Sequence, residues 1–200
     1  MVRNIHENSS LDSFISALEA CRPTFSSISF PEHLQPRRDS THLRGAIAEK
    51  YVELWLQSCP GFSFRHNPRS VNGYTFQKKG RTLLVSEQEK EIIEYDLAGT
   101  YNDTPILAEV KADHARGFMN RVPFALATAQ ALYARPPALL LFVPYPIDSR
   151  ENDTVTRLIE QQNSMFRRIC MNYSSQELRQ AVSSFSRDRG SAEARYMRLS

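Results

Sequence analysis

The stretch EYDLAGTYNDTPILAEVK, residues 94–111, decides how this 200-residue chain folds. It covers most of two segments, 92–101 and 104–111, that are rich in the apolar, aromatic and β-branched side chains typical of strands. The dipeptide Asn102-Asp103 separates them, and both residue types tolerate the left-handed backbone of a tight turn. The pattern therefore predicts two strands paired as a β-hairpin.

Acidic side chains gather on this predicted hairpin. Because side chains alternate across a strand, Glu94 and Asp96 share one face of the first strand. Glu109 and Lys111 share one face of the second strand in the same way. Clustered carboxylates repel one another unless a cation offsets their charge, and Mg²⁺ binds through a few carboxylate oxygens while keeping waters for phosphate groups. The hairpin therefore predicts a divalent-metal site.

The triplet Glu109-Val110-Lys111 carries most of this inference. It is the only Asp/Glu-x-Lys triplet in the chain, and it ends an apolar strand rather than lying in a surface helix. Lys111 would supply positive charge where an anionic transition state develops. A solvated polar strand face with a cross-strand salt bridge is the structural alternative.

A helix predicted over residues 42–57 adds a further acidic candidate. Residues three and four apart share a helix face, so Glu49 lies beside the small side chains of Gly45 and Ala46. A carboxylate on such a face is either half-buried or directed at a ligand, and Gly45 leaves room for a metal or a phosphate. The alternative is a surface glutamate that flanks the core of an amphipathic helix.

The rest of the chain predicts a mixed α/β domain. After the 42–57 helix come short β-prone stretches at 62–66, 70–77 and 81–86. A helix over 121–134, a uniformly apolar strand over 138–143, and a helix that starts with a capping box at Asp148-x-x-Glu151 and continues to Ile169 follow the hairpin. This order predicts one central mixed β-sheet flanked by helices.

The two ends of the chain are predicted to stand apart from this domain. Residues 10–20 predict a short helix with Ser10 as its N-cap, and 21–40 predict an irregular arm rich in proline and serine. Beyond Ser174 the sequence is polar and arginine-rich, which predicts a loosely held tail. The expected organisation is an N-terminal arm with a short helix over 1–41, an α/β domain over 42–173 and a tail over 174–200.

Composition excludes several classes of protein. Charged residues make up 24% and hydrophobic residues 41% of the chain, which is the ordinary balance of a soluble globular domain. The longest apolar run, residues 138–143, is far shorter than the ~20 residues of a membrane span, and the first ten residues contain no apolar leader. Three widely spaced cysteines predict neither a disulfide framework nor a zinc cluster. We therefore expect a cytoplasmic protein without a membrane partner.

Taken together, the helix and the hairpin resemble the PD-(D/E)xK nuclease superfamily. The resemblance covers residues 43–143 and is a match of motifs and their order. Within the superfamily the Arg-Gly-x-x-x-Glu helix is most similar to Holliday-junction resolvases. The resemblance implies a restriction-endonuclease-like αβββαβ core. The motif residues are Arg44-Gly45 with Glu49, and Asp96 with Glu109-x-Lys111.

The resemblance also implies roles for individual residues. Glu49, Asp96 and Glu109 would bind Mg²⁺ or Mn²⁺, and Lys111 would orient or activate the attacking water. Gln130 matches a glutamine often found on the helix after the lysine strand, although an ordinary polar helix position is the alternative.

Two departures from the family pattern affect the expected substrate. Tyr95 stands where the family usually has a proline, and the segment between Gly61 and Ile92 is long enough to predict extra strands at the sheet edge. Further candidates are Asp113 for the metal site and, for phosphate contacts, Arg116, Arg121 and Lys78-Lys79.

The function implied is a Mg²⁺- or Mn²⁺-dependent endonuclease that hydrolyses phosphodiester bonds in nucleic acid, with DNA as the expected substrate. A nuclease of the same fold acting on RNA and a non-catalytic nucleic-acid-binding domain stay open as alternatives. A homodimer is compatible with this function, because many nucleases of this type act on two strands.

Overall fold

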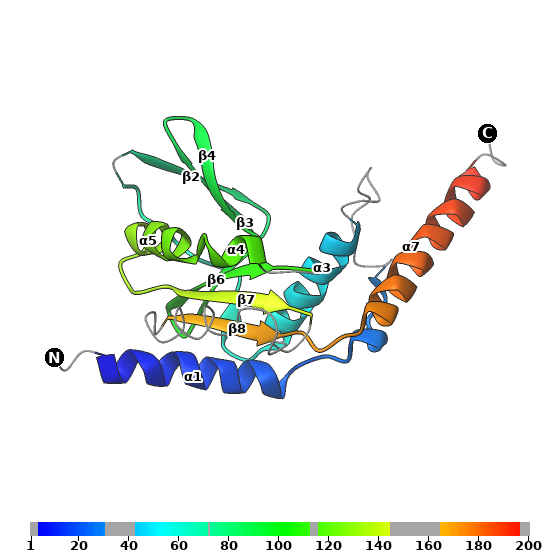
Figure 1. Ribbon diagram of the computed structural model, residues 1–200, viewed down its shortest axis with the longest axis horizontal. Coiled ribbons are helices and arrows are strands. Elements are labelled where there is room, and N and C mark those ends of the chain that lie inside the picture. Colours follow the sequence, from blue (N-terminus) through cyan, green and yellow to red (C-terminus); the bar gives the residue numbers. More distant parts are fainter. Residues whose placement is uncertain (1–3, 31–42, 72, 113–115, 145–164, 197–200) are drawn as a thin grey trace.

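The computed structural model describes residues 4–30, 43–71, 73–112, 116–144 and 165–196, and it shows a mixed α/β protein (Figure 1). Its larger sheet has five strands in the order β1-β5-β6-β7-β8. β1, β5 and β6 pair in antiparallel fashion, whereas β6, β7 and β8 are parallel. The predicted mixed sheet flanked by helices is confirmed at this level. The strands are β1 Phe62–Ser63, β5 Leu97–Tyr101, β6 Thr104–Val110, β7 Ala138–Val143 and β8 Phe166–Cys170.

The predicted hairpin is confirmed as the pair β5–β6. Tyr101 is paired with Thr104 across the turn, and Leu97 is paired with Ala108. Asn102 and Asp103 have φ angles of 45° and 66°, the left-handed pair that a two-residue hairpin turn of type I′ requires.

A second, three-stranded antiparallel sheet corrects two predictions. It consists of β2 Tyr74–Lys79, β3 Thr82–Glu87 and β4 Lys90–Tyr95 in that order. The expected single sheet is therefore wrong, and so is the expected continuous strand over 92–101. That segment leaves the smaller sheet at Tyr95 and enters the larger one at Leu97, with Asp96 at the break. Glu94 consequently belongs to a different sheet from the hairpin.

Both faces of the larger sheet are covered, which explains the uniformly apolar β7. Its residues Leu140 and Phe142 pack into a core that contains helix α3, Leu43–Ser58. Leu139 and Leu141 point the other way, into a core formed with helix α5, Val122–Leu132, and with the three-stranded sheet. Short helix α4, Arg116–Met119, precedes α5. The helices predicted over 42–57 and 121–134 and the buried strand over 138–143 are confirmed.

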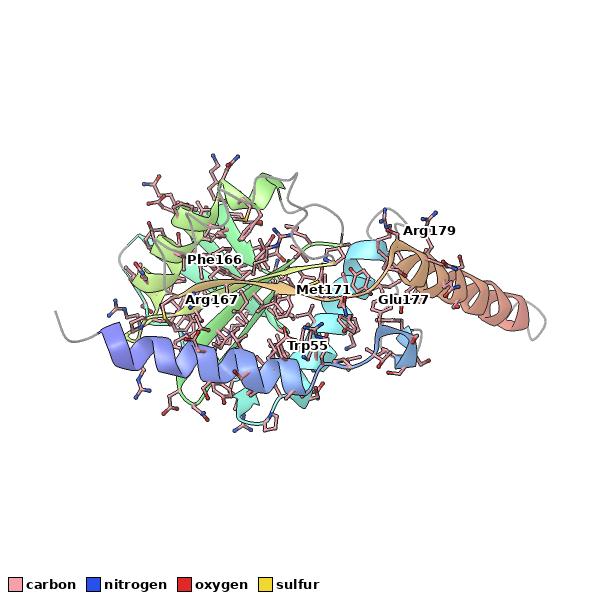
Figure 2. The ribbon with its side chains drawn as sticks, turned by 60° about the horizontal axis from the view of Figure 1, so that its bottom comes forward. Trp55, Phe166, Arg167, Met171, Glu177 and Arg179 are labelled. Atoms are coloured by element: carbon pink, nitrogen blue, oxygen red, sulfur yellow. The ribbon has the colours of Figure 1, made fainter. Side chains whose placement is uncertain are left out.

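Of the predicted N-terminal arm over 1–41, the described residues 4–30 contribute to the core instead, and the rest of the arm lies outside the described residues. Helix α1 spans Asn4–Ala20, so Ser10 lies inside the helix and is not its N-cap. α1 runs along the α3 side of the sheet (Figures 1 and 2). Its residues Leu11, Phe14 and Leu18 are at most 1% exposed. The short 3-10 helix η1, Phe25–Ser27, follows, and Phe25 stacks tilted on Tyr51 at 5.1 Å between ring centroids.

The C-terminal prediction needs two corrections. Residues 166–170 form strand β8 beside β7 instead of continuing a helix, because the short apolar pattern around Phe166 and Ile169 fits both structures. The helix start predicted at Asp148 lies outside the described residues. Helix α7, Ser175–Tyr196, replaces the predicted loose tail and extends away from the sheets (Figure 2).

A capping box explains why α7 begins where it does. Glu177 N–H donates to Ser174 Oγ at 3.1 Å, and Ser174 N–H donates to Glu177 Oε2 at 2.7 Å. Leu178, one turn further, is 1% exposed and belongs to the α3 core. Packing of this first part of the helix therefore ties residues 174–185 to the domain.

Candidate active site

Three of the predicted site residues meet in one pocket of about 420 Å³. Glu49 comes from α3, Asp96 from the break between the two sheets, and Glu109 from β6. These residues are 47 and 13 positions apart in sequence, so only the tertiary fold brings them together. The full lining consists of Glu49, Glu91, Ile92, Ile93, Glu94, Asp96, Glu109 and Arg121.

The sheet break positions Asp96. Its Oδ2 accepts a hydrogen bond of 2.7 Å from the backbone N–H of Val110, and its carbonyl oxygen accepts one of 3.2 Å from Thr82 Oγ1. The first bond joins Asp96 to the hairpin strand that carries Glu109, and the second joins it to the smaller sheet. Asp96 therefore turns the chain from one sheet into the other while its carboxylate stays beside Glu109.

Glu109 is the most buried carboxylate of the pocket, with 7% of its surface exposed. Burial, followed by the nearby charge of Asp96, raises the pKa of its carboxyl to about 7, although the Lys111 hydrogen bond and the charges of Lys111 and Arg121 act against the rise. Burial and the charge of Asp96 make ionisation of Glu109 unfavourable. A cation that enters the pocket would therefore stabilise its ionised form.

Lys111 pairs directly with Glu109 Oε1. Its ammonium group also lies 5.6 Å from the centre of the Phe118 ring, and a third of its side chain is exposed. The backbone N–H of Lys111 donates to Phe142 O at 2.9 Å, which fixes the chain just after β6 to β7. Lys111 is not itself a lining residue of the pocket but is joined to it through Glu109.

Glu49 is supported by a charged network one turn further along α3. Glu53 pairs with Lys50 at 2.6 Å and with Arg81, which precedes β3. The Arg81 guanidinium also lies 4.3 Å from the centre of the Phe64 ring. Burial and then the charge of Arg81 lower the pKa of Lys50. Through the Glu53–Arg81 pair, this network joins α3 to the turn that precedes β3 of the smaller sheet.

Gln130 is not brought to the pocket. It lies on the exposed side of α5 and is absent from the pocket lining. Tyr133, one turn further, is buried and makes a 2.8 Å hydrogen bond with His66 Nδ1. Of the phosphate-contact candidates, Arg121 lines the pocket, whereas Lys78 donates to the carbonyl oxygen of His66. Asp113 lies outside the described residues.

Two acidic residues of the pocket, Glu91 and Glu94, have no counterpart in the predicted motif. Glu91 and Glu94 of β4 stand on the exposed rim of the pocket. Sequence reasoning placed Glu94 on the hairpin and did not consider Glu91, because the sheet break at Asp96 carries no local signal. The residue order alone could not show that β4 folds over the end of the hairpin.

The pocket offers the oxygen ligands that Mg²⁺ and Mn²⁺ prefer. Within the described parts of the chain, no three His, Cys, Asp or Glu side chains stand close enough together to form a complete cation site. Glu49, Asp96 and Glu109 therefore share the pocket without being arranged as a finished ligand set.

Comparisons with known proteins add no relative. No protein-family model matches the chain, and no curated protein or solved structure matches it either. None of the helices described here is long and apolar enough to cross a bilayer.

Proposed function

We propose that this protein is a metal-dependent nuclease with a restriction-endonuclease-like core that hydrolyses phosphodiester bonds in DNA. The observation that carries the proposal is the convergence of Glu49, Asp96 and Glu109 from three separate elements into one pocket, with Lys111 paired to Glu109. Three carboxylates that were selected by motif spacing thus line one pocket, and Lys111 is joined to them through its pair with Glu109.

The order of elements supports the same class. Helix α3, strands β1, β5 and β6, helix α5 and strand β7 follow one another as αβββαβ. The three-stranded sheet is inserted between β1 and β5, where the sequence between Gly61 and Ile92 exceeds the family pattern. The insertion adds Glu91 and Glu94 to the pocket rim without interrupting this core.

Each pocket residue has a chemical task in this proposal. Glu49, Asp96 and Glu109 would hold Mg²⁺ or Mn²⁺, which supplies Lewis acidity toward a phosphate and lowers the pKa of a water ligand. Lys111 would orient the attacking water and offset the charge that develops on the phosphate. Arg121, which lines the same pocket, would hold a phosphate oxygen of the substrate.

A substrate panel tests the proposal directly. Purified protein is incubated with end-labelled single-stranded DNA, duplex DNA, a four-way DNA junction and RNA, each with Mg²⁺, Mn²⁺ or a chelator. We expect cleavage of at least one DNA substrate that needs the metal. Glu109→Gln and Lys111→Ala should each lower the rate by about 100-fold or more, as loss of a preorganised charged group does.

Glu87→Gln is the matched control. This exposed glutamate ends β3 and does not line the pocket, so the variant should cleave like the wild type. Absence of cleavage by wild-type protein on every substrate, together with retained binding of labelled nucleic acid, would instead establish the non-catalytic binding domain. Cleavage of RNA alone would reassign the substrate while keeping the site.

A further inference from the structure

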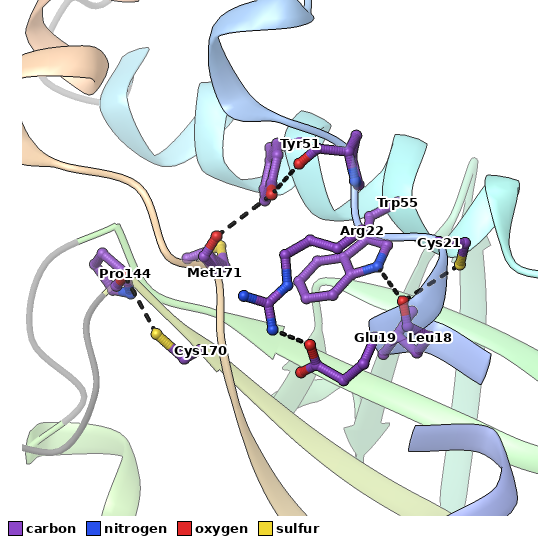
Figure 3. A network of polar contacts seen from close by, with 10 residues as sticks. Leu18, Glu19, Cys21, Arg22, Tyr51, Trp55, Pro144, Cys170 and Met171 are labelled. Carbon is purple, nitrogen blue, oxygen red and sulfur yellow. Dashed lines mark hydrogen bonds and ion pairs between the residues drawn. The ribbon is translucent and has the colours of Figure 1, made fainter. Parts of the chain in front are cut away.

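The last turns of α1 and α3 lie side by side and are joined by two hydrogen bonds. Trp55 Nε1 donates to Leu18 O at 2.7 Å, and Ser58 Oγ donates to Cys21 O at 3.2 Å. The donors are one turn apart on α3, and the acceptors are equally spaced at the end of α1. This register places Cys21, directly after α1, alongside Cys59, directly after α3. Figure 3 shows Cys21 beside Leu18 at this contact.

The two thiols are neighbours in the same core. Both side chains pack against the residues around α3, and Cys21 is close enough to Cys59 to influence the pKa of its thiol. The Cys21 thiol donates to Leu18 O at 3.3 Å, and the Cys59 thiol donates to Pro60 O at 3.9 Å. Cys59 is 2% exposed, whereas Cys21 is partly exposed. A small oxidant can therefore reach Cys21 from solvent, and Cys59 is the buried thiol next to it.

The surroundings give the two cysteines different chemistry. Burial, and next the neighbouring Cys21, raise the pKa of the Cys59 thiol to about 12, so Cys59 stays protonated and does not react first. Cys170, the third cysteine, donates to Pro144 O at 3.6 Å, and Figure 3 shows it on the other side of Trp55 from Cys21. The pairing of Cys21 with Cys59 is thus specific among the three thiols.

We propose that Cys21 and Cys59 form an intramolecular disulfide when the protein is exposed to hydrogen peroxide. Cys21 Sγ attacks a peroxide oxygen, the O–O bond breaks, and Cys21 becomes a sulfenic acid while one water leaves. Cys59 Sγ then attacks the sulfenic sulfur, the S–O bond breaks, and a second water leaves with the Cys59 proton. Two thiols lose two electrons, and one hydrogen peroxide is reduced to two waters.

The cross-link would fasten the N-terminal helix to the helix that carries Glu49. It would close residues 22–58 into a loop and so reduce the conformational freedom of the unfolded chain. The oxidised protein should therefore melt about 5–10 °C above the reduced protein. This inference stands on the α1–α3 contact and is independent of the proposed nuclease activity.

Thiol counting with mass spectrometry tests the proposal on the full chain. Folded protein is treated with hydrogen peroxide, quenched, denatured and alkylated, and its peptides are mapped. We expect one alkylated cysteine, Cys170, and a cross-linked peptide pair containing Cys21 and Cys59 that lacks the mass of two hydrogen atoms. A dithiol reductant should restore three alkylated cysteines and the lower melting temperature.

Matched variants decide between a specific pair and general oxidation. Cys170→Ser should form the cross-link as the wild type does, and Cys21→Ser, which alters only the partly exposed thiol, should show no cross-link and no rise in melting temperature. If Cys59→Ala folds poorly, Cys21→Ser alone supplies the comparison. Three alkylated cysteines, a bridge through Cys170, an intermolecular bridge, or over-oxidised Cys21 without a bridge would each overturn the proposal.

Discussion

Two regions of this protein bury polar groups, and they differ in whether those groups lie beside a favourable partner or beside a like charge. In the aromatic region around α3, Tyr51 Oη donates to the carbonyl oxygens of Pro23 and Met171, and Trp55 Nε1 donates to that of Leu18 (Figure 3). In the pocket, the buried carboxylate of Glu109 lies beside a second carboxylate. In the first region the Tyr51 hydroxyl and the Trp55 indole N–H find carbonyl acceptors, which stabilises the fold. In the second region two carboxylates lie close together, which destabilises it.

This difference in how buried polar groups are paired distinguishes a structural region from a functional one within the same fold. Buried polar groups that find partners specify a unique core, and buried like charges persist where a ligand offsets them. The aromatic region joins three distant segments, 18–23, 51–55 and 171–173, into one unit. Helix α3 carries both Tyr51 and Glu49, so the contacts that hold Tyr51 in the aromatic region also hold the helix that brings Glu49 to the pocket.

Neutralising the buried carboxylate of Glu109 should have the largest effect, because it removes the like-charge repulsion that distinguishes the pocket from the aromatic region. Glu109→Gln should abolish cleavage, as argued above, and at the same time stabilise the protein by on the order of 2 kcal/mol at pH 8. The pKa of Glu109 is about 7 in the folded protein and about 4.5 in the unfolded chain. Between these pH values the unfolded chain has already lost the proton that the folded protein keeps, so the wild type loses stability as the pH rises through this range. Urea unfolding at pH 8 and at pH 4 measures this effect, which should vanish at pH 4.

The opposite sign would contradict the argument. A Glu109→Gln variant that is less stable than the wild type at pH 8 would show that the Lys111 ion pair outweighs burial and the repulsion from Asp96 in the energy of this carboxyl.

His66 provides an intermediate case, a titratable ring that is buried and yet hydrogen-bonded. Burial and then the charge of Lys78 lower the pKa of His66 to about 4, so the folded protein keeps the ring neutral beside Tyr133. The unfolded chain binds a proton below about pH 6.5, so this stability is present above that pH and is lost as the pH falls toward 4. We expect His66 to contribute a loss of about 2 kcal/mol between pH 7 and pH 4, opposite in sign to the contribution of Glu109, and urea unfolding of wild type and a His66 variant separates the two.

A variant isolates the histidine from the other titrating groups. His66→Gln keeps a side chain able to accept from the Tyr133 hydroxyl but cannot titrate, so its stability should fall less steeply over the same interval. Identical pH profiles for the two proteins would exclude His66 as the cause.

Removing the hydroxyl oxygen of Tyr51 tests how much the hydrogen bonds of the aromatic region contribute to stability. Tyr51→Phe deletes the hydroxyl that bonds Pro23 and Met171 and leaves two buried carbonyl groups with one partner fewer. A loss of about 1–2 kcal/mol is expected from the buried acceptors left unsatisfied. Thermal unfolding measures it, and Tyr74→Phe, on the half-exposed strand β2, is the control that should change little.

The sequence predicted those parts of the fold whose signals are local. The β5–β6 hairpin follows from Asn102-Asp103 between two strand segments, and β7 follows from a run of apolar residues that only a doubly covered strand accommodates. Glu49, Asp96 and Glu109 were selected by motif spacing and do share a pocket. The capping box that starts α7 was also readable, as Ser174-x-x-Glu177, but the polar composition of the segment hid it.

The parts that were missed depend on distant contacts. The break at Asp96 is stabilised by Val110 N–H and Thr82 Oγ1, neither of which is near in sequence. β8 exists because β7 offers it a parallel partner, whereas its own five residues fit a helix equally well. Gln130 lies outside the pocket because α5 turns its small residues to the sheet and leaves that position in solvent.

Arg121 offers the smallest and most specific test of the pocket. It stands at the N-cap of α5, lines the pocket, donates to Ile92 O at 3.4 Å, and counters the rise in the pKa of Glu109. If it holds a phosphate, Arg121→Ala should lower cleavage about tenfold and reduce the salt dependence of DNA binding by about one phosphate contact. Arg121→Lys should recover part of the binding, because it keeps the charge but not the two-pronged geometry.

The control for this variant is Arg135→Ala. Arg135 forms an exposed pair with Asp103 at 3.7 Å, with 66% of its side chain in solvent, and it does not line the pocket. Equal cleavage and equal salt dependence for the two variants would remove Arg121 from the substrate site. A selective effect of Arg121→Ala on binding, with an unchanged melting temperature, would place the nucleic-acid backbone across the rim formed by β4 and the start of α5.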